Sequence, residues 1–350
     1  MLSTVLKSFL LASVFFEGSY SQLRNIQMNH KGSKLSGNGI KYLAGLSNIN
    51  YINEILDNIL IQRVVGTPGH QKVFDYINKE LKDLNWTVDI DEFTDATPKG
   101  PLKFKNIIAT LNPNAERYLV LACHYDSKYF ENIVFVGAID SAVPCAMMLN
   151  LIKVMDKELK SIQSNDLNLK LIFFDGEEAF EEWGPQDSIY GAKHLAQTYQ
   201  NSKTKSLISG EDVTEIDKID IFVLLDLIGH KETQFLSTFT DTESWYLRLA
   251  DIEDRLKNLR LLGYPRKTYF RKRRAQYEIE DDHIPFLRRN VPILHLISIP
   301  FGSIWHTAHD NRSAVDMTTV ENINKILRIF VAEYLNIDLR HTESIPEKEL

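Results

Sequence analysis

Residues 169–184 read LKLIFFDGEEAFEEWG. The run is almost entirely apolar until it ends abruptly at Asp175, which the adjacent carboxylates Glu177 and Glu178 closely follow. A short apolar run of this kind is typical of a strand buried on both faces, as the central strands of parallel sheets are. Active sites in open α/β sheets lie at the carboxyl ends of such strands. We therefore expect the two glutamates at an active-site edge.

The rest of the chain alternates predicted strands with predicted helices. Two more runs, IFVLL at 221–225 and ILHLI at 293–297, are also apolar on both faces. Strands are predicted at 87–93, 104–111, 118–122, 169–174, 219–225 and 293–297. Helices are predicted at 41–64, 70–84, 142–159, 189–199, 244–259 and 319–335, with a short one near His283. This alternation predicts an α/β fold with a mixed, mainly parallel central sheet and helices on both faces.

Polar groups recur where these predicted strands end. His124 and Asp126 follow the strand at 118–122, and Asp226 follows the strand at 219–225. Asp140 comes just before one predicted helix, and His306 comes before the last one. For any single residue here, capping of a helix is the alternative interpretation. Because the ends of parallel strands meet at one edge of a sheet, we expect the whole group to share one cleft.

The residue types in this group favour a zinc site. Asp, Glu and His without thiolates form an oxygen and nitrogen ligand set, and catalytic zinc commonly has three protein ligands plus an open position. Adjacent side chains on an extended backbone point in opposite directions. We therefore expect one of Glu177 and Glu178 to hold the metal, and the other to face the substrate as an acid or base.

Six stretches of the sequence carry a family resemblance. They are LACHYDSKYF at 121–130, VGAIDSAVPCAMML at 136–149, LIFFDGEEAFEEWGPQDSIYGAKHLA at 171–196, VLLDLIG at 223–229, DDHIPFLRRNVPILHLI at 281–297, and the WH of IWHTAHDN at 304–311. Across roughly residues 50–336, the chain resembles the animal glutaminyl-peptide cyclotransferases (glutaminyl cyclases), which are relatives of zinc-dependent aminopeptidases. The resemblance implies an aminopeptidase-like α/β fold.

The resemblance also implies a metal centre and a catalytic group. One Zn²⁺ per chain would be held by Asp140, Glu178 and His306, and Glu177 would serve as the acid and base. The implied reaction closes the N-terminal glutamine of a peptide or protein, with glutamate as a further candidate, to pyroglutamate with release of ammonia. Zinc would polarise the γ-carbonyl group, while Glu177 would take a proton from the α-amine and return it to the ammonia.

The remaining implied roles concern the surroundings of this centre. Asp226 and Asp281 would form a hydrogen-bonded carboxylate pair beside Glu177. The aromatic wall of the substrate pocket would consist of Trp183, Phe301 and Trp305. The chain departs from the family pattern at Glu280, where we expect an amide side chain.

Two other interpretations of the same residues remain open. In a two-zinc aminopeptidase, Glu177 would activate water. Its metal ligands would be His124, Asp140, Glu178, Asp226 and His306. A non-catalytic binding domain on the same scaffold is the third possibility, but such a domain is free to lose ligands and none is missing here.

The two cysteines of the chain are Cys123 and Cys145. An even count in a secreted protein permits one disulfide, and burial as two small apolar side chains is the alternative. The resemblance implies that these two cysteines form a disulfide near the active site, as in secreted members of the family.

The first residues have the pattern of a signal peptide. Lys7 precedes a short apolar run at 9–16, and small residues follow at the spacing that signal peptidase prefers. We expect residues 1–21 to be removed, so that Gln22 begins the mature protein. The sequence then predicts a secreted single α/β zinc-dependent catalytic domain at 22–350. A mitochondrial presequence is the alternative, because the first acidic residue is Glu17.

Charge and composition limit the partners. The net charge of -7 argues against nucleic acid, and no apolar run is long enough to cross a membrane. The basic cluster at 271–274 is expected to be a solvated loop. Two sequons, at Asn85 and Asn311, are compatible with glycosylation. We expect a monomer whose partners are its peptide substrates.

Overall fold

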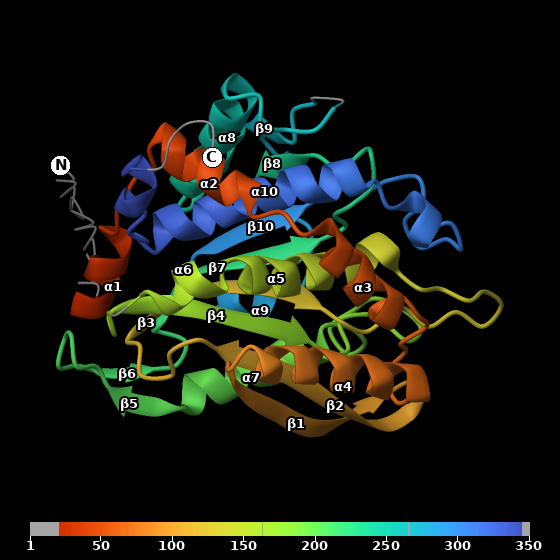
Figure 1. The fold of residues 1–350 in the computed structure, drawn as a ribbon. Helices are drawn as coiled ribbons and strands as arrows, with labels where there is room; N and C mark the ends of the chain where they lie inside the picture. The colour runs from red at the N-terminus through yellow and green to blue at the C-terminus, as the bar shows by residue number, and fades with distance from the viewer. Residues whose placement is uncertain (1–20, 163, 265–266, 345–350) are drawn as a thin grey trace, which may run out of the picture.

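The computed structural model describes residues 21–162, 164–264 and 267–344, and centres on a six-stranded sheet in the order β1-β2-β4-β3-β7-β10 (Figure 1). The strands are β1 Thr87–Thr97, β2 Gly100–Thr110, β3 Arg117–His124, β4 Leu167–Phe174, β7 Ile219–Asp226 and β10 Ile293–Ile297. β4, β3, β7 and β10 run parallel, whereas β2 pairs antiparallel with both β1 and β4. The predicted mixed, mainly parallel sheet is confirmed.

Helices and two small sheets surround this sheet. The helices are α1 Gln22–Met28, α2 Gly37–Gly45, α3 Ile49–Ile59, α4 Pro68–Asp83, α5 Val143–Val154, α6 Asp156–Lys160, α7 Tyr190–Asn201, α8 Glu243–Asn258, α9 Ile284–Leu287 and α10 Met317–Tyr334. Shorter helical turns are η1 Ala138–Ala142, η2 Arg312–Ala314 and η3 Arg340–Ser344. The small sheets pair β5 Lys203–Lys205 with β6 Asp212–Thr214, and β8 Phe235–Ser237 with β9 Phe270–Arg274.

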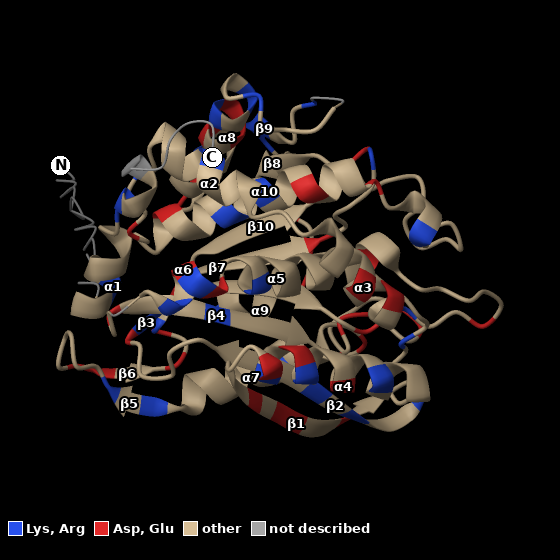
Figure 2. Cartoon of the chain, viewed as in Figure 1, with Lys and Arg blue, Asp and Glu red and all other residues tan. Residues whose placement is uncertain are grey.

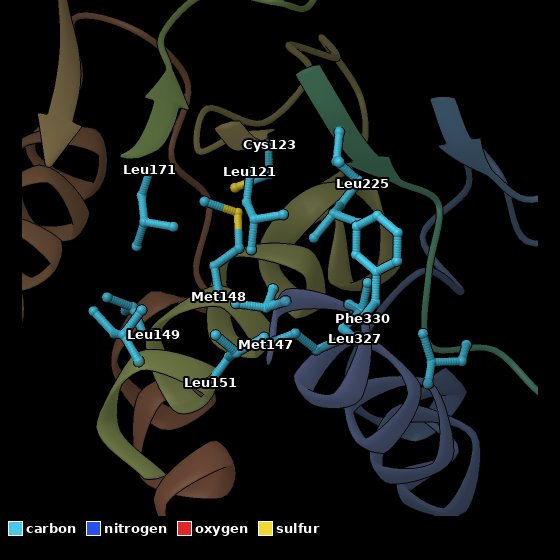
Figure 3. Packing of buried hydrophobic residues seen from close by; sticks show 14 of the residues in the cluster. Leu121, Cys123, Met147, Met148, Leu149, Leu151, Leu171, Leu225, Leu327 and Phe330 are labelled. Carbon is cyan, nitrogen blue, oxygen red and sulfur yellow. The ribbon is translucent and has the colours of Figure 1, made fainter. Parts of the chain in front are cut away.

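The two faces of the sheet bury two separate apolar cores. Because side chains alternate along a strand, Leu121 and Cys123 of β3 face one core, and Val120 and Ala122 face the other. The first core is filled by residues of α2 to α5, α8 and α10, and Figure 3 shows part of this packing. The second core is filled mainly by α7 and α9. The prediction of helices on both faces is confirmed, and the packing explains why the central strands are apolar throughout.

The region predicted as one helix at 41–64 contains two helices. α2 ends at Gly45, and Asn48 then caps α3 by accepting a hydrogen bond from the backbone N–H of Tyr51 at 3.0 Å. Asparagine favours this capping position because its side-chain oxygen satisfies a free backbone donor at the start of a helix. The apolar spacing of the region continues through the break, which is why periodicity alone missed it.

The expectation of a loop at the basic cluster 271–274 is wrong. These residues belong to β9, which pairs with β8, and their side chains are exposed. Figure 2 marks the Lys and Arg positions of the chain in blue, those of β9 among them. Lys272 Nζ lies 2.8 Å from Asp254 Oδ2, and Arg274 Nη2 lies 2.8 Å from Glu243 Oε2. These neighbouring carboxylates offset part of the positive charge of the cluster. Tertiary pairing formed this strand, because consecutive charged residues have little intrinsic preference for one.

The predicted signal peptide at residues 1–21 lies almost wholly outside the described residues. Among the described residues, no helix has both the length and the apolar character needed to cross a membrane.

Candidate active site

A cavity of about 480 Å³ is lined by residues from the carboxyl edge of the sheet, a volume suited to a small ligand. Its lining includes all nine of the catalytic, metal and substrate residues predicted from the sequence: Asp140, Glu177, Glu178, Trp183, Asp226, Asp281, Phe301, Trp305 and His306. The structure therefore brings together residues that are up to 166 positions apart in the chain (306 minus 140).

The neighbouring strands β4, β3 and β7 deliver several of these groups to one edge. β3 ends at His124 and β7 ends at Asp226, while the two glutamates follow β4 after a tight turn. Gly176 makes that turn with a φ of 66°, and a Cβ atom there would lie 2.4 Å from the ring of Phe104. Only glycine fits this position, which places Glu177 and Glu178 directly over the strand ends.

Asp140, Glu178 and His306 form a set with the character of a metal site. One ligand atom from each lies within 4.8 Å of the others. His306 Nε2 is 3.4 Å from Asp140 Oδ2 and 3.5 Å from Glu178 Oε1. Both of those carboxylate oxygens are buried, and neither makes a hydrogen bond within the described parts of the chain. Two buried, unsatisfied oxygens beside an imidazole nitrogen are a donor set that fits zinc.

His124, Asp140 and Asp226 form a second candidate set. Here the carboxylate oxygens already have partners. His124 Nε2 lies 3.1 Å from Asp140 Oδ1, and Asp226 Oδ1 accepts hydrogen bonds from the Ser141 hydroxyl and from the backbone N–H of Leu227. In the first set, Asp140 Oδ2 and Glu178 Oε1 have no hydrogen-bond partner within the described residues, whereas here Asp226 Oδ1 is satisfied by groups outside the set, so the first set is the better cation site.

Glu177 occupies an environment that favours its protonated form. It is 7% exposed, and burial together with the nearby carboxylates of Glu178, Asp281 and Asp282 raises its pKa well above the usual value, although His124 opposes the shift. A carboxyl group whose pKa has moved toward neutrality can both take and return a proton near pH 7. The geometry and the electrostatics therefore suit the acid and base role that the sequence suggested for Glu177.

Asp226 and Asp281 both line the cavity, but no hydrogen bond joins them within the described residues. Asp281 Oδ2 lies 2.7 Å from His295 Nε2, and burial lowers the pKa of His295 to about 4, so a neutral imidazole donates to the carboxylate. Burial and the charges of Asp140 and Asp281 raise the pKa of Asp226 to about 6, against the influence of His124, whose Nε2 lies 3.6 Å from Asp226 Oδ1. The two carboxylates are coupled through charge, and each has its own hydrogen-bond partner.

Aromatic rings form one side of the cavity. Trp305 stacks on the imidazole of His306 with ring centroids 4.0 Å apart, and Phe301 lies 4.8 Å from Trp305. Trp183 donates from Nε1 to the carboxylate of Glu280 at 3.3 Å. Glu280, the departure noted in the sequence, therefore has a structural partner and still lines the cavity.

Known proteins are similar to this chain in sequence and in fold. The model of peptidase family M28 matches residues 106–331. The glutaminyl-peptide cyclotransferase of Drosophila melanogaster is 50% identical over 320 residues, which cover 88% of this chain and 87% of the relative. The chain belongs to the glutaminyl-peptide cyclotransferase family.

Solved structures agree with membership of the glutaminyl-peptide cyclotransferase family. The Macrostomum lignano glutaminyl cyclase has a TM-score of 0.83 at 36% identity, covering 89% of this chain and 98% of that chain. A Zn-dependent exopeptidase from Parabacteroides distasonis has a TM-score of 0.63 at 21% identity, covering 80% of this chain and 94% of that chain. The similarity to the exopeptidase concerns the fold alone. It shows that a protein described as Zn-dependent has the same fold.

Several residues that shape this site had no specific role assigned from the sequence. Lys128 lines the cavity, and its ammonium group lies 3.4 Å from Glu178 Oε2. The carboxylate of Asp126 accepts the backbone N–H groups of Glu177 at 3.1 Å and Glu178 at 3.3 Å. Asp310 accepts the backbone N–H of Ile139 at 2.9 Å, next to Asp140. A polar residue soon after a central strand is the only signal that pointed to Lys128 and Asp126.

A buried ion pair supports the turn that carries the glutamates. His70 Nε2 lies 2.7 Å from Asp175 Oδ1, and the ring of Tyr125 stacks on His70 at 5.1 Å. Burial lowers the pKa of His70, but the charge and hydrogen bond of Asp175 outweigh it, so the pKa is raised above 6.5. A raised pKa means that the protonated imidazole stabilises the folded state.

The His70→Gln variant should lose more stability in acid than in base. The raised folded-state pKa gives a contribution that is complete below the unfolded value of 6.5 and disappears as the pH rises through the folded value. The difference in free energy of unfolding between the parent and His70→Gln should therefore be larger at about pH 5.5 than at about pH 9, measured by urea denaturation. A difference that does not change with pH would mean that the pair carries no extra proton in the folded state.

Cys123 and Cys145 meet beneath the site. Their Sγ atoms lie 2.8 Å apart as buried thiols, and Cys145 Sγ donates to the carbonyl oxygen of His124 at 3.2 Å. A disulfide brings two sulfurs to about 2.05 Å, so a small movement would join them. The disulfide stays a prediction, and the pair lies directly under one of the strand ends that form the cavity.

Oxidation of this pair should stabilise the protein by about 2–4 kcal/mol, because the bond restricts the unfolded chain. Thermal melting of the protein with and without a reductant measures this effect. The Cys145→Ala variant is the control, and it should melt at the same temperature under both conditions because the chain has two cysteines in total. If the melting temperature of the parent protein is the same with and without the reductant, the predicted disulfide is contradicted.

Proposed function

We propose that this chain converts the N-terminal glutamine of peptides and proteins to pyroglutamate, with release of ammonia, at a centre that holds one zinc ion. N-terminal glutamate is a further candidate substrate. The observation that carries the metal centre is the pair of unsatisfied buried oxygens, Asp140 Oδ2 and Glu178 Oε1, beside His306 Nε2. The activity is that of the relatives, which are named glutaminyl-peptide cyclotransferases.

The reaction needs no external nucleophile. The α-nitrogen of the substrate forms a bond to its own γ-amide carbon, and the bond from that carbon to the amide nitrogen then breaks. Bound zinc would supply a Lewis acid for the γ-carbonyl oxygen. The protein itself would hold the glutamine side chain bent back toward the α-amine. Binding then places the α-nitrogen and the γ-amide carbon in a favourable orientation for reaction.

Glu177 moves the proton in this scheme. It accepts a proton as the α-nitrogen attacks, and it donates that proton to the nitrogen that leaves as ammonia. The unperturbed α-amine has a pKa of about 7.7, so a useful neutral fraction exists at neutral pH. Asp126 keeps Glu177 and Glu178 in place through their backbone N–H groups. Asp281 adds negative charge nearby, which helps to keep the pKa of Glu177 high, and Asp226 lines the same cavity.

The cavity wall suits a small, flat lactam ring. Trp183, Phe301 and Trp305 supply aromatic surface, and Leu227 and Ile297 line the cavity beside them. Apolar walls exclude water, which strengthens the electrostatic interactions of the polar groups that remain.

A two-zinc aminopeptidase is the second candidate, because the set of His124, Asp140 and Asp226 also gathers. The hydrogen bonds that Asp226 Oδ1 already accepts from the Ser141 hydroxyl and the Leu227 backbone N–H favour one zinc per chain. Metal analysis separates the two functions, since the cyclase requires about one zinc per chain and the hydrolase about two.

Mass spectrometry of a glutamine-initiated peptide tests the function directly. Zinc-loaded protein should remove the mass of ammonia from the peptide, and a chelator should abolish this reaction. A peptide that begins with asparagine instead is the matched control, because its shorter side chain would have to close a smaller, strained ring. Release of a free amino acid in place of ammonia would establish a peptidase and overturn the proposal.

We also propose a secreted, monomeric protein that begins at Gln22 after removal of residues 1–21. The apolar run near the N-terminus supports secretion. Asn85 is exposed at a turn before β1, so it is the more accessible glycosylation candidate. Asn311 is partly buried, and its side-chain amide donates to the Ala308 carbonyl at 2.7 Å.

A further inference from the structure

Arg63 is a buried cation between the segments that build the site. It follows α3 and is 1% exposed. Its guanidinium group donates to main-chain carbonyl oxygens: from Nε to Tyr125 at 2.7 Å, from Nη1 to Val136, and from Nη2 to Gly137 at 2.9 Å and Asp140 at 3.3 Å. These bonds use donors on all three nitrogens of the group.

The two segments that Arg63 contacts control two different metal ligands. Residues 136–140 end in Asp140 itself, so the carbonyl oxygens that Arg63 binds fix the path of the chain up to that ligand. Tyr125 precedes Asp126, and the carboxylate of Asp126 accepts the backbone N–H of Glu178. The guanidinium group of Arg63 therefore connects the segment that carries Asp140 to the segment that orients Glu178.

The backbone of Arg63 also bonds to the segment that contains Tyr125 and Asp126. Its backbone N–H donates to Ser127 Oγ at 3.0 Å, and its carbonyl oxygen accepts the N–H of Ser127 at 3.3 Å. The guanidinium group makes no ion pair within the described ranges of the chain, although Asp126, Asp140 and Asp310 act on it through charge. A buried cation without a contacting carboxylate is costly unless its donors are satisfied, and here carbonyl oxygens satisfy them.

We propose that Arg63 is a positioning residue for the metal centre, whose guanidinium group sets the spacing between Asp140 and Glu178. The inference rests on the proposed zinc site. Lysine cannot reproduce this arrangement, because its three donors lie on one nitrogen, whereas Arg63 donates from three separate nitrogens to the carbonyl oxygens of both segments. The arginine acts through the backbone and does not touch the substrate.

Arg63→Lys tests the inference, because it retains a cation while removing the planar group. Retention of the charge matters, since loss of a nearby positive charge would by itself favour zinc binding. We expect the zinc affinity, measured by competition with a chelator on the folded protein, to fall by about 10–100-fold, as it does when partners that orient metal ligands are removed. The visible absorption spectrum of the Co²⁺-loaded variant should also differ from that of the parent, because it reports the ligand geometry.

Arg328→Lys is the matched control. Arg328 is also fully buried, but it lies on α10 and binds the Leu43 carbonyl at 3.1 Å and Glu321 at 2.8 Å, away from the cavity lining. This variant should lose thermal stability and keep the zinc affinity and cobalt spectrum of the parent. If Arg63→Lys behaves in the same way, Arg63 is merely structural and the inference is wrong.

Ser127→Ala provides a second route if Arg63→Lys does not fold. It removes the hydroxyl group that accepts the backbone N–H of Arg63, so the zinc affinity should fall less but in the same direction. An unchanged affinity in this variant would also refute the inference. A parent protein that binds no zinc would instead refute the proposed metal centre, so the two failures are distinguishable.

Discussion

Glu177→Gln should lower kcat by about 10²–10⁴-fold, because the variant keeps the shape of the side chain and cannot move a proton. Zinc should remain bound, since the three proposed ligands Asp140, Glu178 and His306 are untouched. The rate of ammonia release from a glutamine-initiated peptide measures the first effect, and metal analysis of the same sample measures the second. Substrate binding should change little, because the amide occupies the space of the carboxylate.

Glu182→Gln is the matched control for this experiment. Glu182 also lines the cavity, but its side chain is exposed and makes no ion pair among the residues that the structure describes. Its loss should leave kcat close to that of the parent. If Glu177→Gln retains the activity of the parent, the proton transfer belongs to another group, and Asp226 or Asp281 becomes the better candidate.

His306→Ala should remove the metal and the activity together. The change deletes one of three proposed ligands, and we expect zinc affinity to fall by more than the roughly 100-fold loss that is typical when only an orienting partner is removed. Two negative carboxylates would then face each other without their imidazole neighbour. Zinc content after dialysis against a weak chelator measures the result, and turnover should disappear in parallel.

His309→Ala controls for the loss of an imidazole from the same loop. His309 lies three residues after His306 and is exposed, and its side chain does not line the cavity. This variant should retain zinc and activity. The side chain of His306 is itself 23% exposed, so both variants should fold, which thermal melting can check. Full zinc content in folded His306→Ala would contradict the proposed ligand set.

Much of the fold could be predicted from local patterns. The apolar runs that form β4, β7 and β10 are buried on both faces, and a run of consecutive apolar residues is enough to predict this burial. The break between α2 and α3 and the strand β9 could not be predicted in this way. The first depends on a cap within an uninterrupted apolar spacing, and the second depends on pairing with β8, which is 35 residues away (270 minus 235).

The candidate site could be predicted as a group, but the partners of its members could not. The types and positions of the carboxylates at the strand ends indicated one cleft, and the structure gathers them in one cavity. The resemblance implied a hydrogen bond between Asp226 and Asp281, which stays a prediction, and the structure adds Ser141 and His295 as partners of the two carboxylates, respectively. Hydrogen bonds depend on the directions of side chains, and a linear pattern does not encode those directions across different strands.

The sequence alone determined which residues are available for metal and proton chemistry and at which edge of the sheet they gather, because strand ends and residue types are local properties. Only the tertiary structure decided which carboxylate oxygens are left without a partner and that Arg63 connects the two ligand segments. Those features depend on distances between parts of the chain that are brought together by the packing of two apolar cores against one sheet.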